Sequence, residues 1–232
     1  MRNASLPAGA LLLLLSTTGF AQVAPSAAEA SAYSGLFSAA YRGNAPSLQQ
    51  LLDGGSTGKA DLDARDGNGR TPIHVATFAR QREAIRVLTK AGANLQLLDK
   101  DRYDPVTIAA VADDEETLRV LLELGASAKL ITSRYDGTAL IAAAHLGHDG
   151  VVRQLIAAGA PLDHVNNLHW TAMIEAIVLG QGGPRHQEVV RALLTAGAST
   201  QLADRDGATP LQLAKRRGYA EIVQLLDRAN AR

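Results

Sequence analysis

The sequence predicts an all-α solenoid of about six helix-turn-helix repeats. Two repeated phrases lead to this prediction. The first starts with Thr or Asp, and its copies begin 33, 34, 33 and 38 residues apart, at Thr71, Asp104, Thr138, Thr171 and Thr209. The second is a Gly-Ala pair that follows the first three starts by 21 residues and the fourth by 26. Two phrases in register at this period are typical of stacked repeats rather than of one globular core.

Composition agrees with thin, closely packed helices and argues against some classes of partner. Of the 232 residues, 47% are hydrophobic but only 4% are aromatic, which predicts a core of Ala, Leu, Val and Ile. Lys plus Arg equal Asp plus Glu at 23 each. Because no strong electrostatic field results, we do not expect the protein to bind nucleic acid.

The N-terminus has the features of a secretory signal peptide. Arg2 provides a positive charge, residues 10–15 an apolar run, and Gly19-Phe20-Ala21 a small-x-small cleavage site. A membrane anchor is the alternative, but spanning a bilayer takes about 20 apolar residues. We expect residues 1–21 to be removed, leaving a mature chain without a membrane span. The protein is then exported, to the periplasm if the source is a Gram-negative bacterium and otherwise out of the cell.

The remaining chain divides into a leader and a repeat domain. Residues 22–32 are rich in Ala, Ser and Pro and predict a flexible leader. The repeat domain follows over residues 33–232, and its first copy is degenerate. The expected repeats lie at about 33–65, 66–98, 99–132, 133–165, 166–203 and 204–232.

Local chemistry justifies the elements of each unit in order. Thr138 stands where a helix N-cap belongs, and other copies have Pro at the first helical position, where its missing N–H is not needed. A short Ala-rich helix follows, and Gly147 ends it because glycine tolerates positive φ. The second helix has an apolar stripe at helical spacing: Val151, Val152, Leu155 and Ile156.

These units resemble ankyrin repeats, whose Thr-Pro-Leu-His-x-Ala signature is close to Thr71-Pro72-Ile73-His74-Val75-Ala76. The resemblance extends from about Tyr33 to the C-terminus. It implies an ankyrin-type solenoid in which His74 is a structural imidazole that bonds to neighbouring backbone. It also implies that the residues before each Thr project as fingers beside the exposed face of the first helices. We therefore expect a monomeric, non-catalytic protein that binds a partner protein and needs no cofactor.

Three of the nine aromatic residues fall on adjacent fingers, at Tyr103, Tyr135 and Trp170. Tyr, Trp and Arg dominate binding hot spots because they bring large area and few rotamers. The alternative is that these side chains pack on neighbouring fingers and stiffen the edge. Glu175 is an acid in an otherwise apolar helix. It either pairs with one of the finger arginines or with a basic side chain of the partner, or it is solvated in the groove. The predicted partner-binding residues are Arg70, Arg102, Tyr103, Arg134, Tyr135, His169, Trp170 and Glu175.

Two departures from the repeat frame have competing interpretations. The fifth repeat gains five residues, about 181–185, before His186. This insertion is either a tolerated surface loop or a specific contact through Arg185 and His186. Residues 54–59 resemble a phosphate-binding loop, but Asp53 replaces its first glycine and Ala60 its Ser/Thr. We therefore do not expect nucleotide binding.

Other functions remain as alternatives. His164 and His169 share the finger of repeat five, and His145 and His148 are three residues apart, so a metal-binding or enzymatic protein is one alternative. However, the sequence has no Cys and no Gly-x-Ser-x-Gly motif. A secreted effector that acts on a host protein is another alternative. For the preferred interpretation, the resemblance to exported bacterial ankyrin proteins implies a partner that is either an enzyme the protein supports, for instance in oxidative-stress defence, or a toxin that it neutralises.

Overall fold

The computed structural model describes residues 22–54 and 61–231. The expected signal peptide and most of the loop at 54–59 lie outside these residues. The described part contains thirteen α-helices and no strand beyond one isolated bridge, between Thr132 and Gly137. Among these helices none is long and apolar enough to cross a membrane. The predicted all-α solenoid is confirmed.

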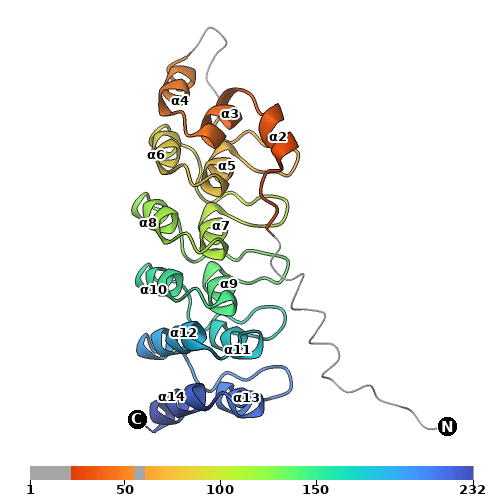
Figure 1. The fold of residues 1–232 in the computed structure, drawn as a ribbon, viewed down its shortest axis with the longest axis vertical. Helices are drawn as coiled ribbons and strands as arrows, with labels where there is room; N and C mark the ends of the chain where they lie inside the picture. The colour runs from red at the N-terminus through yellow and green to blue at the C-terminus, as the bar shows by residue number, and fades with distance from the viewer. Residues whose placement is uncertain (1–21, 55–60, 232) are drawn as a thin grey trace, which may run out of the picture.

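Six helix pairs stack in a row, and one pair falls within each predicted repeat (Figure 1). We call the first helix of each pair the inner helix and the second the outer helix. A further short helix, α2 (Ala27–Ala32), precedes them. The pairs, inner helix first, are α3 (Gly35–Arg42) and α4 (Ala45–Leu52), α5 (Pro72–Phe78) and α6 (Arg82–Lys90), α7 (Pro105–Val111) and α8 (Glu115–Glu123), α9 (Ala139–Leu146) and α10 (Asp149–Ala157), α11 (Ala172–Val178) and α12 (Pro184–Thr195), and α13 (Pro210–Arg217) and α14 (Ala220–Asn230).

Capping explains where the inner helices begin and end. Thr138 caps α9, since its Oγ1 accepts from the backbone N–H of Ile141 at 3.3 Å. Gly147 ends the same helix in the left-handed conformation, at φ +73°. A Cβ there would lie 2.8 Å from the ring of His186, so both backbone and packing favour glycine.

The core is continuous along the stack, because each helix pair packs against the pairs on either side of it. Small residues such as Ala143 and Ala144 are fully buried where inner helices meet, and Leu155 is fully buried on the outer row. His74 has the expected structural role. Its Nδ1 accepts from the backbone N–H of Thr71 at 3.2 Å, and its Nε2 bonds the carbonyl of Tyr103 at 3.1 Å.

The fingers are the loops that precede the inner helices, at 66–70, 99–103, 133–137, 166–170 and 204–208, and we number them two to six after their repeats. A polar residue at the base of each finger orders the turn. For example, Oδ1 of Asp204 accepts from the backbone N–H of Asp206 and of Ala208, at 3.0 and 2.8 Å.

Backbone hydrogen bonds also join neighbouring fingers. The N–H of Lys100 donates to the carbonyl of Asn68 at 3.0 Å, and that of Ser133 donates to Arg102 at 2.9 Å. The N–H of Asn167 in turn donates to the carbonyl of Tyr135 at 3.0 Å. Fingers two to five therefore form a bonded row.

The expectation of a flexible leader over 22–32 requires correction. Residues 27–32 form α2, which lies beside α3 and α5 (Figure 1). Ser26 and Glu29 form a capping box, in which each side chain accepts from the other's backbone N–H. Composition alone missed the helix because its stability comes from this cap and from contacts with finger two.

Candidate functional site

Three consecutive fingers carry side chains at a backbone position that favours glycine. The residue three places after each finger base has a positive φ, and it is glycine in fingers two and six, Gly69 at +72° and Gly207 at +75°. Fingers three, four and five place Arg102, Asp136 and His169 there, at +64°, +52° and +64°. Left-handed backbone costs a non-glycine residue about 1–2 kcal/mol. These fingers therefore present a side chain at the expense of strain.

The same fingers expose several of the predicted contact residues. Nη1 of Arg102 lies 3.3 Å from Oδ1 of Asp136, and both side chains are 49% exposed. Arg134 and His169 are exposed, and Tyr135 is half-buried. Fingers three to five thus form an accessible polar edge with an aromatic residue within it.

Trp170 has a double role at this edge. Its side chain packs against the hydrophobic core and is half-buried. Its backbone N–H donates to Oδ1 of Asn166 at 3.0 Å, which fixes the finger below the ring. The ring of Trp170 thus packs inward against the core, yet it is not fully enclosed.

Three predicted contact residues are instead interior. Arg70, Tyr103 and Glu175 are 1%, 5% and 1% exposed, so none of them is available to a partner in this conformation. Arg70 is enclosed by bonds to its own finger and to the N-terminal segment. Burial raises the pKa of Tyr103 to about 12, which keeps its hydroxyl neutral at physiological pH.

Glu175 belongs to a buried polar network that the sequence analysis missed. One carboxylate oxygen accepts from Nδ2 of Asn166 at 2.8 Å, and the other lies 3.3 Å from Nδ1 of His145. Burial raises the pKa of Glu175, and the two partners counter that rise. A signal was present, since Asn166 stands where Asp66, Asp99 and Asp204 stand in other fingers. An Asp there would repel Glu175, whereas Asn donates to it.

Most of the histidines are engaged in structural bonds rather than gathered at a metal centre. His148 bonds the backbone carbonyl of Ala110 in the preceding repeat at 2.9 Å, and His164 bonds that of Asp136 on finger four at 2.6 Å. Across residues 22–54 and 61–231, no group of three or more His, Cys, Asp or Glu is placed to hold a metal ion.

The insertion in repeat five is tied back to the rest of the molecule. Arg185 ion-pairs with Asp113 and with Asp149, at 2.9 and 3.2 Å. The hydroxyl of Tyr219 donates to the carbonyl of Gly180 at 2.9 Å. Arg185 is therefore engaged within the chain, on the side of the helix turns and not of the fingers.

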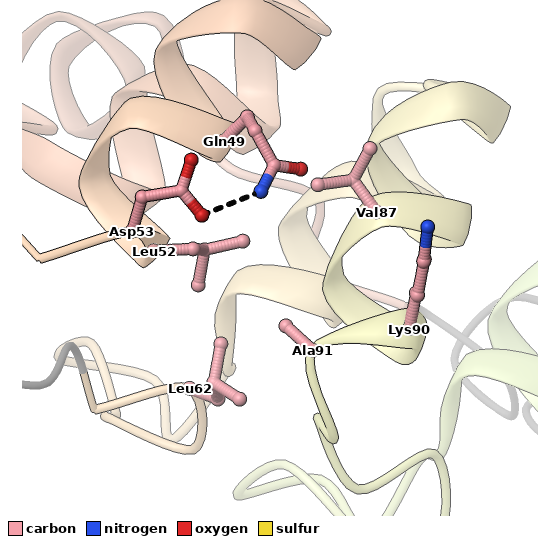
Figure 2. Close-up of a pocket in the computed structure, with 7 residues that line it drawn as sticks. All are labelled: Gln49, Leu52, Asp53, Leu62, Val87, Lys90 and Ala91. Atoms are coloured by element: carbon pink, nitrogen blue, oxygen red, sulfur yellow. Dashed lines mark hydrogen bonds between the residues drawn. The ribbon is translucent and has the colours of Figure 1, made fainter.

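A shallow pocket lies between the outer helices α4 and α6, away from the fingers (Figure 2). Its volume is about 300 Å³, and Leu52, Leu62 and Val87 provide its apolar lining. The polar groups Gln49 and Asp53 bond each other at 2.8 Å. The pocket is thus separate from the edge formed by fingers three to five.

Comparison with protein families agrees with this architecture. The family model for three copies of ankyrin repeats matches residues 36–132 and 124–204, and that for a single ankyrin repeat matches 206–231. The putative ankyrin repeat protein YahD of Escherichia coli K12 is 35% identical over 172 residues, which cover 74% of this chain and 85% of that protein.

Solved structures show the same fold. An ankyrin repeat domain from Acinetobacter baumannii AYE is 44% identical, with a TM-score of 0.77 over 84% of this chain and 97% of its own. A chain of the complex between a predatory endopeptidase of Bdellovibrio bacteriovorus and its immunity protein has a TM-score of 0.68 at 22% identity, covering 84% and 98%. The likeness to the second concerns the fold alone. The family models span most of the sequence, and the chain belongs to the ankyrin repeat family.

Proposed function

We propose that this protein is an exported interaction module that binds a partner protein across fingers three, four and five and the adjoining groove. The proposal rests on one observation: Arg102, Asp136 and His169 have a left-handed backbone conformation, with positive φ. Fingers two and six show that the same turn forms with glycine.

The ion pair between two of these side chains offers little compensation for the strain. The ion pair between Arg102 and Asp136 is half-exposed, and such pairs contribute at most about 1 kcal/mol. The strain at Arg102 alone is at least as large. A contact outside the chain explains why side chains are present there, since strained non-glycine residues gather at functional sites.

The surrounding edge suits protein recognition. Arg134 and the half-buried rings of Tyr135 and Trp170 adjoin the three strained residues along the fingers. Backbone bonds hold these fingers in place before binding, so little conformational freedom is lost on association.

The signal-like N-terminus supports an exported compartment, the periplasm if the source is Gram-negative. There the partner is an enzyme that the protein supports, for instance in stress defence, or a toxin that it neutralises. Fractionation distinguishes this proposal from a secreted effector, which accumulates outside the cell instead.

The test removes the three side chains without harming the fold. We expect the triple variant Arg102→Gly, Asp136→Gly and His169→Gly to melt at the wild-type temperature or above, because glycine relieves the strain. In crosslinked affinity capture from the native compartment, it should lose the partner that the wild type retains.

Arg80→Gly is the matched control, since Arg80 also has a positive φ, +57°, but lies at a helix turn and not on a finger. It should capture the partner normally. Equal capture by the triple variant and the wild type would sink the proposal.

A further inference from the structure

Arg70 is the centre of a buried cluster that joins finger two to the N-terminal segment, residues 22–32. Its Nη2 lies 2.5 Å from Oε1 of Glu29, and its Nη1 donates to the carbonyl of Val23 at 3.1 Å. Its Nε bonds Oδ2 of Asp66 at 2.7 Å. The guanidinium therefore contacts a carboxylate of its own finger, a carboxylate of α2 and the extended backbone before α2.

Finger two offers a second donor to the same carboxylate. Nδ2 of Asn68 lies 2.6 Å from the same Oε1 of Glu29. Farther along the segment, Nε2 of Gln22 donates to the carbonyl of Thr107 on α7 at 3.0 Å. Arg70 and Asn68 thus converge on one carboxylate oxygen, and we call this pair the carboxylate seat.

The segment that fills the seat makes several polar contacts with the stack and has no fully buried residue in its helix. None of the six residues of α2 is buried, and the side chain of Val23 is 53% exposed. Little apolar area is lost when such a segment leaves, so local opening requires far less free energy than unfolding of the stack. Arg70 keeps its bond to Asp66 after opening, which avoids leaving an unpaired charge.

We propose that the carboxylate seat is a ligand site that the chain's own segment occupies in the free protein. Its ligand is an extended peptide that leads into a helical turn bearing an acidic side chain. A partner with this pattern displaces residues 22–32 and gains finger two, next to fingers three to five. The inference rests on the proposed function only for the existence of such a partner, and its test needs the purified protein alone.

Glu29→Gln in the full mature chain separates the charge from the helix cap. Glutamine has one acceptor oxygen where Glu29 uses two, so it keeps the capping box when that oxygen faces Ser26, and its Nε2 then faces Arg70 and Asn68 without an ionic bond. We expect hydrogen-deuterium exchange at Ala30 and Tyr33, whose N–H groups bond the carbonyls of Ser26 and Glu29, to become at least about tenfold faster. Ser26→Ala is the matched control, because it removes the cap and keeps the ion pair.

Binding of a synthetic peptide of residues 22–33 measures whether the carboxylate seat is occupied. The peptide should bind the Glu29→Gln protein at least about tenfold more tightly than it binds the wild type or Ser26→Ala, because the tethered segment competes at high effective concentration. The same peptide with Gln in place of Glu29 should bind at least about tenfold more weakly.

Three results would overturn the proposal. They are unchanged exchange in Glu29→Gln, equal binding of the two peptides, and a wild-type mass that corresponds to a dimer with exchanged segments. Loss of partner capture by the finger variants bears on the proposed function and leaves these measurements unaffected.

Discussion

The guanidinium of Arg185 lies 2.9 Å from the carboxylate of Asp113, although 72 positions separate the two residues. Asp113 has a positive φ, +52°, in the turn between α7 and α8. Arg185 also bonds Asp149, so a residue of the repeat-five insertion connects repeats three, four and five. This engagement favours a structural role for Arg185 over a direct contact with a partner.

Arg185→Ala should lower the free energy of unfolding by less than about 1 kcal/mol, because the pair is half-exposed. The loss should shrink as salt is added. Urea unfolding at low and high ionic strength measures both effects. Arg191→Ala, which removes a pair within one helix, is the control. If Arg185→Ala instead lost partner capture while its stability changed this little, Arg185 would belong to the binding surface.

Glu175→Gln should raise the melting temperature at neutral pH. Burial raises the pKa of Glu175, so the folded protein binds its proton more tightly than the unfolded chain does. Its contribution is therefore favourable at low pH and is lost as pH rises above the unfolded value of about 4.5. Glutamine keeps the hydrogen bonds without the buried charge. Thermal melts of Glu175→Gln and of the exposed control Glu188→Gln, from below pH 4.5 to neutral pH, test this. Equal shifts of the melting temperature in the two variants would contradict it.

His74 should make the fold sensitive to acid. Burial lowers its pKa to about 4 from an ordinary value of 6.5, so the stability it supports is complete above pH 6.5 and falls as pH drops towards 4. The loss amounts to roughly 3 kcal/mol. In His74→Gln, which does not titrate, the unfolding free energy should change less steeply with pH over this window. Chemical denaturation at a series of pH values provides the comparison.

Leu155→Ala should cost about 2–5 kcal/mol, because Leu155 is fully buried between α10 and its neighbours. Leu51→Ala should cost less than about 1 kcal/mol, since Leu51 is exposed on α4. Equal midpoints for the two variants in denaturant would mean that the apolar stripe of the second helices does not form the core.

The repeat frame was predictable because it rests on local chemistry. Thr138 as a cap, Gly147 as a helix end and Leu155 as a core residue all follow from the preferences of single residues at fixed positions. The role of His74 followed from the family resemblance. Each of these features depends on neighbours within one repeat or the next, and the sequence holds that information at a constant spacing.

Burial on the fingers was not predictable in the same way. Arg70 occupies the last position of its finger, which is also buried at Tyr103 in finger three, whereas Arg102 stands one position earlier and is exposed. Residues 22–32 add a contact to the guanidinium of Arg70. That contact spans more than 40 positions and has no periodic signal. The left-handed backbone positions of fingers three to five did have a sequence signal, since Gly69 and Gly207 align with them.

The bonded row of fingers has a mechanical consequence. Fingers two to five are joined through main-chain atoms, whereas finger six is connected to finger five by the side chain of Arg205, whose Nη2 donates to the carbonyl of Asn167 at 3.3 Å. A force on any of the first four spreads to the others, so they offer a shape that resists deformation. We expect the sixth to deform more readily than the others, because a side-chain bond rather than a main-chain bond joins it to finger five.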